Sequence, residues 1–474
     1  MKILIASTEV NPYSKSGGLG DVIGSLPQAL RAKNMDVRVV LPLYKSIPAH
    51  LLEGAKVVAD FTVNLSWRAH HARVLQLGHV YFIQNDQYFY RDGYYGYDDD
   101  FERFAFFSKA SVELCGQVNF QADILHFNDW HTGLGPTYLQ GVYRQFAFYS
   151  KMKSLFTIHN LNYQGIFGRE VLWEIGLNDG YYTSGQLEFH GKISYLKAGL
   201  VHADAISTVS ETYAREIQTS AYGYRMEGIL HQRGAIEGNL YGITNGIDTT
   251  EYNPETDPRI INFTAETLDK KRENKHRLQE ELGLPVSDAP MLAMITRLAE
   301  QKGLDILSII MEELLGLDVQ LVVLGTGDSK YENMLRHHAW HNPHKVSANI
   351  TFDSGLAQRI YAGADMFLMP SVYEPCGLGQ LFAMRYGTIP IVRKTGGLAD
   401  TVQHFVPSLG TGNGFLFEDF VASGLMWAIR EALYAYHSED GWWEMLVKNA
   451  MAGDYSWEKA AGEYVDMYRK ILEG

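Results

Sequence analysis

Short apolar runs that alternate with amphipathic helical patterns constrain the fold of this chain more than any other feature. Amphipathic stretches such as residues 22–33 and 101–115 lie between the runs. Continuous apolar strands separated by helices form parallel sheets that are covered on both faces. We therefore expect an α/β protein with Rossmann-like, doubly wound domains. The expected strands are residues 2–7, 37–42, 79–84, 123–128, 154–159, 204–210, 290–298, 318–325, 348–353, 364–371 and 388–395.

The length of 474 residues exceeds what one ordinary core accommodates, so two domains are expected. A seam lies at LYGITNGID, where a strand-rich segment gives way to a polar connector and a charged helix. We place an N-terminal domain at 1–241 and a second domain at 242–454. The amphipathic helix expected at 455–474 could pack back on the first domain.

The composition excludes several classes of protein. With 41 basic and 55 acidic residues, the net charge of −14 disfavours a partner such as nucleic acid or an anionic membrane. Only Cys115 and Cys376 are present, so a disulfide framework is not expected. No run approaches the ~18 apolar residues of a membrane span, and the N-terminal apolar run is too short for a secretory signal. The expected location is the cytoplasm.

A repeated glycine motif stands out: KSGGLGDVI at 15–23 returns as KTGGLADTV at 394–402. The first copy lies between a strand and a helix, where backbone amides and the helix dipole favour an anion, and Lys15 adds a positive charge. The repeat could mark two phosphate sites, two similar domains at matching junctions, or coincidence. We expect Lys15 to carry more functional weight than Lys394.

Two nucleotide-binding signatures are weak or missing. The spacing of Gly18, Gly20 and Gly24 resembles a dinucleotide fingerprint, but its tight form is absent and no acid ends the second strand. No P-loop sequence occurs. NAD, FAD or a P-loop nucleotide is therefore disfavoured.

Two segments of the second half follow strands and carry polar groups. Arg297 and Lys302, five residues apart around a turn, could converge on one diphosphate. In EPCG, Glu374 could accept hydrogen bonds from sugar hydroxyls, and the free amides of the next helix could bind phosphate. The Cys376 thiol is expected to be buried and structural, because no neighbouring residue is an evident base for it. The turn GTGD at 325–328 could receive a nucleotide.

Two histidine-containing strand ends form a further group. Asp129 and His131 lie in NDWHTG, and His159 and Asn160 lie in HNLNYQG. Metal-binding spacings are absent, so a metal site is not expected. These side chains suit a hydroxyl-rich substrate better.

Taken together and in this order, the motifs identify a family. KSGGLGDV, NDWHTG, HNLNYQG, GITNGID, ITRLAEQKG, GTGD, YEPCGLGQL and KTGGLADTV resemble those of bacterial glycogen synthases, with similarity also to plant starch synthases. The resemblance covers essentially the whole chain.

The resemblance implies a GT-B fold, two Rossmann-like domains facing across a deep cleft, with donor binding by the second domain and glucan binding by the first. It implies retaining transfer of glucose from ADP-glucose to the non-reducing-end 4-hydroxyl of glycogen or a maltooligosaccharide, without metal or organic cofactor. The implied catalytic residues are His159, Arg297, Lys302 and Glu374. The implied substrate-binding residues are Lys15, Gly17, Gly18, Asp21, Glu9, Asp129, Asn160, Asn245, Gly325, Phe352, Cys376, Gly377, Leu378 and Gly379.

Several alternatives stay open from sequence. UDP-glucose could replace ADP-glucose, and the retaining step could run on one face of the sugar or through two displacements. A non-catalytic glucan-binding protein or a nicotinamide dehydrogenase would share the fold class. Sharing one diphosphate between Lys15 and Arg297 would require domain closure about residues 242–248.

Overall fold

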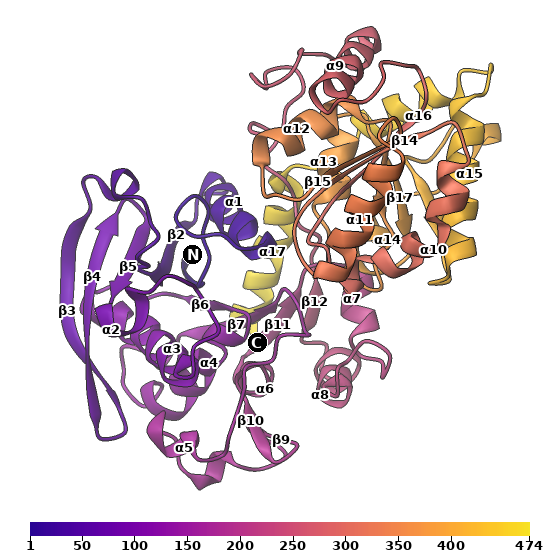
Figure 1. Cartoon of the computed structure of the whole chain (residues 1–474). Coiled ribbons are helices and arrows are strands. Elements are labelled where there is room, and N and C mark those ends of the chain that lie inside the picture. Colours follow the sequence, from indigo (N-terminus) through magenta and orange to yellow (C-terminus); the bar gives the residue numbers. More distant parts are fainter. The chain divides into compact units, whose positions relative to one another are not determined.

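The computed structural model describes residues 1–474, which divide into two compact units (Figure 1). Unit 1 comprises Met1–Asn245 together with Trp457–Gly474, and unit 2 comprises Gly246–Ser456. The chain therefore leaves unit 1 once and returns to it once. Each unit has its own sheet and its own hydrophobic core.

Unit 1 is built on a nine-stranded sheet that contains all six strands predicted in the first half of the chain. Its last two strands, which the sequence analysis did not predict, form an antiparallel hairpin, and the other seven strands are parallel. In spatial order the strands are β12 (Leu240–Gly242), β11 (Ala205–Thr208), β7 (Lys153–Ile158), β6 (Ile124–Asn128), β1 (Lys2–Ala6), β2 (Asp36–Pro42), β5 (Val80–Gln84), β4 (Arg68–Leu77) and β3 (Lys56–Leu65).

Helices of very different lengths accompany this sheet. The longest are α1 (Gly18–Ala32), α3 (Asp100–Gln117) and α17 (Trp457–Glu473). The shorter ones are α2 (Asp86–Phe89), α4 (Leu134–Tyr138), α5 (Val171–Glu174), α6 (Tyr195–His202), α7 (Glu211–Glu216) and α8 (Glu227–His231). A small antiparallel sheet orders β8 (Ile166–Phe167), β10 (Lys192–Ser194) and β9 (Glu188–Phe189).

Helix α17 is the segment that returns to unit 1, where it packs along α1. Its apolar face, at helical spacing, is buried in the core of that unit. The hydroxyl of Tyr468 lies 2.9 Å from Nδ1 of His126 on the central strand β6, in fully buried surroundings. A polar contact in the core thus fixes the position of the last helix.

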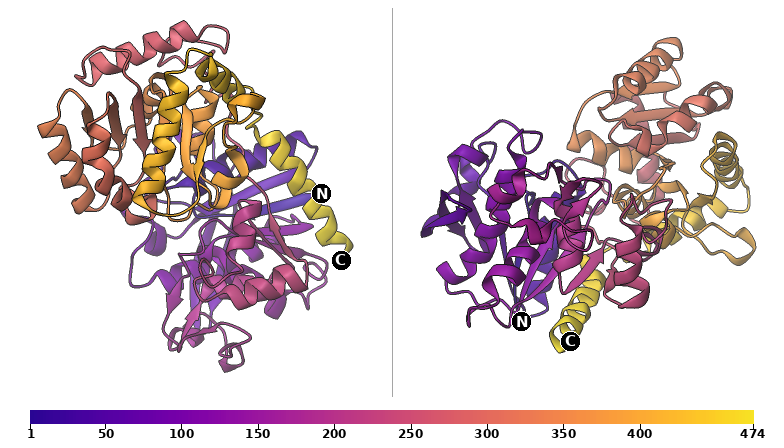
Figure 2. Two further views of the ribbon diagram at one scale, coloured as in Figure 1. Left: turned by 90° about the vertical axis from the view of Figure 1, so that its right-hand side faces the viewer. Right: turned by 90° about the horizontal axis from the view of Figure 1, so that it is seen from below.

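Unit 2 is built on a six-stranded, fully parallel sheet with helices beside its strands (Figure 2). In spatial order the strands are β15 (Val346–Asn349), β14 (Gln320–Leu324), β13 (Met291–Ile295), β16 (Met366–Met369), β17 (Ile389–Arg393) and β18 (Phe415–Phe417). The helices are α9 (Leu268–Glu281), α10 (Leu304–Leu315), α11 (Ser329–His341), α12 (Ser354–Gly363), α13 (Gly379–Arg385), α14 (Gly396–Thr401), α15 (Ala422–Tyr436) and α16 (Trp442–Met451). No helix of either unit is long and apolar enough to cross a membrane.

Both sheets reverse their strand order at one point. In unit 1 the reversal lies between β1 and β6, and in unit 2 it lies between β13 and β16. Numbered along the parallel strands, unit 2 has the Rossmann order 3-2-1-4-5-6, and unit 1 has the same order extended by one strand. The prediction of two Rossmann-like domains is confirmed. Ligands of such sheets bind outside the carboxyl ends of the strands at the reversal.

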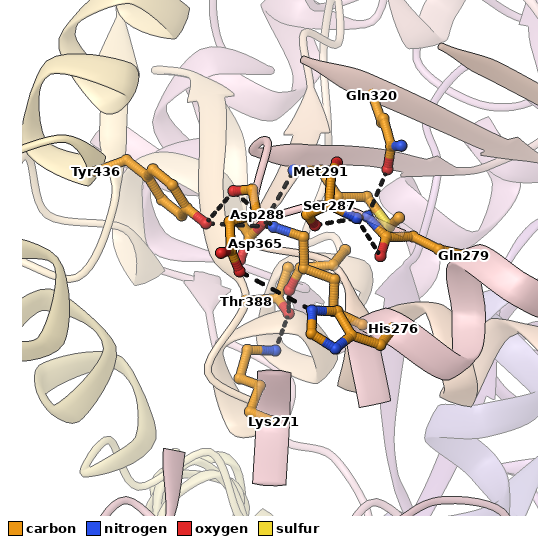
Figure 3. A network of polar contacts seen from close by, with 12 residues as sticks. Lys271, His276, Gln279, Ser287, Asp288, Met291, Gln320, Asp365, Thr388 and Tyr436 are labelled. Carbon is orange, nitrogen blue, oxygen red and sulfur yellow. Dashed lines mark hydrogen bonds and ion pairs between the residues drawn. The ribbon is translucent and has the colours of Figure 1, made fainter. Parts of the chain in front are cut away.

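A buried polar network ties α9 to the opposite, amino-terminal end of the unit 2 sheet (Figure 3). The Asp365 carboxylate, just before β16, accepts hydrogen bonds from Lys275 at 2.7 Å and from the Met291 amide at 2.8 Å. The ammonium of Lys271 donates to the Thr388 hydroxyl at 2.9 Å, and burial lowers the pKa of Lys271 to about 7. These contacts join α9 to the start of β13 and to the residues just before β16 and β17.

Replacing Tyr468 by Phe tests how far α17 depends on its contact with His126. We expect the free energy of unfolding of unit 1 to fall by about 1–2 kcal/mol, because the His126 ring keeps its buried position and loses a hydrogen-bond partner. Urea unfolding followed by fluorescence measures the change. Tyr44→Phe is the matched control, since the Tyr44 hydroxyl is buried without a hydrogen-bond partner. Equal midpoints for the two variants would contradict the assignment.

Candidate functional site

The loop between β1 and α1 is held in shape by the buried carboxylate of Glu9. This carboxylate accepts hydrogen bonds from the Ser16 amide at 2.5 Å, the Ser16 hydroxyl at 2.6 Å and the Gly17 amide at 3.1 Å. The Tyr95 hydroxyl donates to it at 2.8 Å. Since both carboxylate oxygens accept hydrogen bonds, the main role of Glu9 in this structure is to position the loop.

Lys15, at the tip of this loop, is available to an incoming anion. Its ammonium lies 2.6 Å from Oδ1 of Asp21, and both side chains are partly exposed. Burial raises the pKa of Asp21, and the charge of Lys15 opposes that rise. Gly17 precedes the first residue of α1, Gly18, and a Cβ at Gly17 would meet nothing within 4 Å. The backbone of this loop is therefore open on the side of Gly17.

The other glycines of the loop have a packing role. A Cβ at Gly20 would lie 3.1 Å from Cβ of Lys15, and a Cβ at Gly24 would lie 2.9 Å from the carbonyl oxygen of Asn11. Both glycines let α1 pack closely against its own loop. The spacing that resembles a dinucleotide fingerprint is thus explained without a dinucleotide.

The carboxyl ends of β1, β6 and β7 are joined by side chains of Asn128, Asp129 and His159. The Asp129 carboxylate accepts a hydrogen bond from the His159 amide at 2.8 Å. The Asn128 side chain donates to the Ala6 carbonyl at 3.1 Å and lies 2.9 Å from Nε2 of His159. Asn160, next to His159, accepts a hydrogen bond from the Asn162 amide at 3.1 Å. These contacts gather the predicted residues at the point where the strand order reverses.

Burial changes the protonation of two of these groups. It lowers the pKa of His159 to about 3, so the imidazole is neutral near pH 7. It raises the pKa of Asp129 to about 7, although the His159 and Asn160 amides partly oppose the rise. Near neutral pH this edge presents hydrogen-bond donors and acceptors with little fixed charge.

Asn245 lies at the end of unit 1, after β12. Its side chain is 6% exposed, and its amide oxygen is buried without a hydrogen-bond partner. Buried acceptors are paired in most structures, so an unpaired one is a candidate to receive a ligand hydroxyl.

In unit 2, Lys302 and Glu374 form a close ion pair beside the reversal point. Lys302 follows β13 and Glu374 follows β16, and their Nζ and Oε2 atoms lie 2.6 Å apart. The Ser371 hydroxyl donates to the same Oε2 at 3.0 Å. Arg297 contacts Gln301 at 3.3 Å, and Gln301 in turn contacts the Tyr373 carbonyl at 3.3 Å. The two predicted cations and the carboxylate thus belong to one cluster.

The EPCG segment packs directly against the second glycine motif. A Cβ at Gly396 would lie 1.9 Å from the Glu374 carbonyl oxygen, and a Cβ at Gly397 would lie 2.2 Å from the Cys376 carbonyl oxygen. The Gly397 amide donates to the Glu374 carbonyl at 3.1 Å. Glycine is required here so that two backbones can touch. The KTGG segment thus packs against the backbone of Glu374 and Cys376.

The first turn of α13 follows this segment. Gly377 has a φ of +72°, and Leu378 caps the helix that begins at Gly379. The first amides of a helix lack intrahelical acceptors, so they can donate to a ligand oxygen. The Gln380 side chain donates to the carbonyls of Cys376 at 3.1 Å and Gly377 at 3.0 Å. Cys376 itself is buried.

The turn GTGD and the residue Phe352 lie farther along the same edge. Gly325 has a φ of +152°, and a Cβ there would lie 1.8 Å from the Thr296 carbonyl oxygen, so this glycine also permits a close backbone contact. Phe352, after β15, is 85% exposed. Its ring is free to stack on a planar group.

The two glycine motifs occupy different places in the two sheets. KSGGLGDV follows β1, the first strand of unit 1, whereas KTGGLADTV follows β17, the fifth strand of unit 2. The strand of unit 2 that corresponds to β1 is β13, which is followed by Arg297. The expectation of matching junctions was wrong.

Sequence reasoning missed the side chains that position the site. These are Tyr95, Asn128, Gln301 and Ser371, which hold Glu9, His159, Arg297 and Glu374. Asn128 is the first residue of the recognised motif NDWHTG, and Ser371 lies two residues before YEPCGLGQL. Tyr95 lies in a tyrosine-rich loop far from Glu9 in sequence, and only the fold brings it there.

Each edge has its own chemical character. Unit 2 offers Arg297, Lys302 and backbone amides to an anion, together with one carboxylate. Unit 1 offers neutral amide and imidazole groups suited to hydroxyls, with Lys15 beside them. No group of three or more His, Cys, Asp or Glu side chains is arranged to hold a metal ion.

Comparisons with known proteins agree with this description. Residues 2–232 match the family described as starch synthase catalytic domain, and residues 277–440 match the family described as glycosyl transferases group 1. A glycogen synthase of Desulforudis audaxviator is 49% identical, and the match covers 100% of this chain and 97% of that protein. A glycogen synthase of Clostridium acetobutylicum is 48% identical, with 100% of both chains covered.

A solved structure is similar along the whole chain. The catalytic domain of starch synthase IV from Arabidopsis thaliana, bound to ADP and acarbose, has a TM-score of 0.92 and 31% identity, with 100% of this chain and 99% of that chain covered. A sucrose-phosphate synthase from Thermosynechococcus elongatus has a TM-score of 0.61 at 19% identity, with 100% and 99% covered, and shows the fold alone.

Replacing Asp129 by Asn tests the protonation of the buried carboxyl group. The pKa of Asp129 is higher in the folded chain, at about 7, than its ordinary value of 3.8. Its contribution to stability is therefore fully present below pH 3.8 and is lost as the pH rises through 7. We expect wild type to lose up to about 4 kcal/mol relative to Asp129→Asn between these limits, measured by urea unfolding at several pH values. Parallel pH profiles would contradict the shift.

Proposed function

This chain belongs to the glycogen synthase family and is a glucosyltransferase of the GT-B class, and we propose that it transfers glucose from ADP-glucose to the 4-hydroxyl at the non-reducing end of an α-1,4-glucan. The family assignment from sequence motifs is confirmed by relatives 46–49% identical over full length. The donor, the glucan acceptor and the roles of individual residues are parts of the proposal.

The cluster of Lys302, Glu374 and Ser371 is the observation that carries the proposal. Both contacts of the Glu374 carboxylate, from Lys302 at 2.6 Å and from Ser371 at 3.0 Å, fall on Oε2. Oε1 is left to accept hydrogen bonds from sugar hydroxyls, and the Lys302 ammonium keeps two further donors. One cluster can therefore contact both the glucose and the diphosphate of a nucleotide sugar.

Departure of the diphosphate is the step for which the chain must supply positive charge. When the bond between the sugar and the diphosphate breaks, negative charge grows on the phosphate oxygens and positive charge grows on the sugar ring. Arg297 and Lys302 stabilise the leaving anion, and the amides of Gly377, Leu378 and Gly379 add neutral donors. Lys15, with the open backbone at Gly17, is proposed as a further cation for the same group.

Neutral groups of unit 1 are proposed to hold the transferred sugar. The imidazole of His159 is uncharged near pH 7, so it serves as a hydrogen-bond partner and not as an acid. The unpaired oxygen of Asn245 is a suitable acceptor for the 6-hydroxyl. Asp129 fixes the backbone after β7 through the His159 amide, which orients the carbonyl proposed to face the reacting carbon.

The preference for ADP-glucose rests on two supports. The similar starch synthase catalytic domain from Arabidopsis was solved with ADP and acarbose. In this chain the exposed ring of Phe352 and the turn at Gly325 lie on the edge of unit 2 where a base could stack.

Replacing Arg297 or Lys302 by Ala tests the diphosphate site. We expect the turnover number to fall by about 10²–10³ in each variant, because a preorganised donor to the leaving anion is lost. Release of ADP in the presence of glycogen measures it. Lys448→Ala is the matched control, since this exposed lysine of unit 2 pairs only with the acids Glu444 and Glu266. Near-normal turnover with an intact melting profile would refute the role of the changed residue.

The direct test of the function is transfer from two donors. Purified protein is incubated with maltotriose and either ADP-glucose or UDP-glucose, and both nucleotide release and chain extension are followed. We expect ADP-glucose to support extension with a kcat/KM at least about tenfold above that of UDP-glucose, with the α-configuration retained in the product. A preference for UDP-glucose would overturn the donor, and no transfer from either would overturn the proposed function.

A further inference from the structure

A cavity lies in unit 2, beside the edge strand β18. Its volume is about 520 Å³, which is in the range of small-ligand sites. Its lining comes from the ends of β17 and β18, the start of α15 and the segment after α14. The lining residues are Lys394, His404, Leu416, Phe417, Glu418, Asp419, Val421, Ser423, Gly424 and Trp427. None of them belongs to the proposed donor site.

The cavity has an aromatic wall. The Trp427 side chain is 48% exposed, although it lies on a helix with an otherwise well-buried apolar face. Its ring is nearly parallel to that of His404, with an angle of 6° between the planes and 5.8 Å between the centroids. The Leu416 amide donates to Nδ1 of His404 at 3.1 Å, which fixes this ring and leaves its hydrogen on Nε2 when the ring is neutral. A flat, fixed aromatic surface is thus exposed to a ligand.

Polar groups stand around this wall. The Lys394 ammonium lies 2.8 Å from Oε1 of Glu418, and Asp419 follows directly in the chain. The charged lining therefore comprises one cation and two carboxylates. Such a lining offers donors and acceptors together but repels a phosphate or a nucleotide. A neutral ligand that carries several hydroxyl groups fits it best.

Gly424 keeps the floor of the cavity open. A Cβ at this position would lie 3.1 Å from the Asp419 carbonyl oxygen, 3.4 Å from the Phe417 ring and 3.5 Å from a methyl group of Val421. Any side chain larger than a methyl group would therefore project among the lining residues.

We propose that this cavity binds glucosyl units of a glucan chain away from its reacting end. The proposal rests on the proposed function, because the glucan acceptor is the ligand that the chemistry of the cavity matches. The CH face of a glucose ring packs on Trp427, and its hydroxyls bond to Glu418, Asp419, Lys394 and Nε2 of His404. Such a contact raises the affinity for a polymer by holding it at a second point. It also gives Lys394 of the second glycine motif a role outside the diphosphate site.

The test uses β-cyclodextrin, a closed ring of α-1,4-linked glucose that has no non-reducing end and cannot be extended. Calorimetric titration is run on the full chain in the presence of excess ADP. We expect wild type to bind the ring, Trp427→Ala to weaken binding about tenfold, and Trp427→Phe to retain most of it. Trp340→Ala is the matched control, because Trp340 is an 83% exposed tryptophan of the same unit outside the cavity. Its binding should equal that of wild type.

A second variant guards against a folding defect in Trp427→Ala. Asp419→Ala removes an exposed acceptor and leaves the aromatic stack intact, so it should weaken cyclodextrin binding several-fold at an unchanged melting temperature. We also expect Trp427→Ala to raise the KM for glycogen. No binding by wild type, or equal binding by wild type and both variants, would overturn the proposal. Extension of maltotriose by wild type is measured separately, so a failed cavity and a failed function give different results.

Discussion

The close approach of backbones at the carboxyl end of the unit 2 sheet is the constraint on which the proposed site depends. The loops that follow β13, β16 and β17 touch one another through glycines, and at Gly396 and Gly397 a side chain would overlap the carbonyls of Glu374 and Cys376. This contact fixes the EPCG backbone, and the backbone aims the carboxylate at Lys302. The loops beneath the ion pair are thus held in close contact, with the Gly397 amide bonded to the Glu374 carbonyl.

Much of the fold could be predicted because buried parallel strands leave a strong signal. All eleven predicted strands have a counterpart in the structure, because most are apolar over four or more residues, although β15 (Val346–Asn349) overlaps the predicted 348–353 only at its last two residues. The hairpin β3–β4 was missed because it is an antiparallel edge with one face in water, and residues such as His71 and Arg73 interrupt its apolar pattern. Site residues adjacent to motifs were predictable for the same local reason. The roles of Tyr95 and of Asn128, although Asn128 belongs to NDWHTG, were not predicted, because these residues act on Glu9 and His159, which only the folded chain brings near.

The two glycine motifs show that similar sequences can have different structural roles. In KSGGLGDV the backbone at Gly17 is open, and the lysine stands near a helix start. In KTGGLADTV a neighbouring backbone occupies the space where a side chain of either glycine would stand, and the lysine pairs with Glu418. Both motifs connect a strand to a helix, but their turns differ: Gly17 is extended, with a φ of −160°, whereas the corresponding Gly396 has a φ of +45°.

The return of α17 to unit 1 has a consequence for how the chain is made. The core of unit 1 is completed by residues from Trp457 onward, which leave the ribosome after all of unit 2. During synthesis the surface of α1 that α17 covers stays exposed while the whole of unit 2 is produced. Unit 2 is continuous in sequence and can fold as soon as it emerges. Unit 2 can therefore complete its fold before unit 1, although most of unit 1 is translated first.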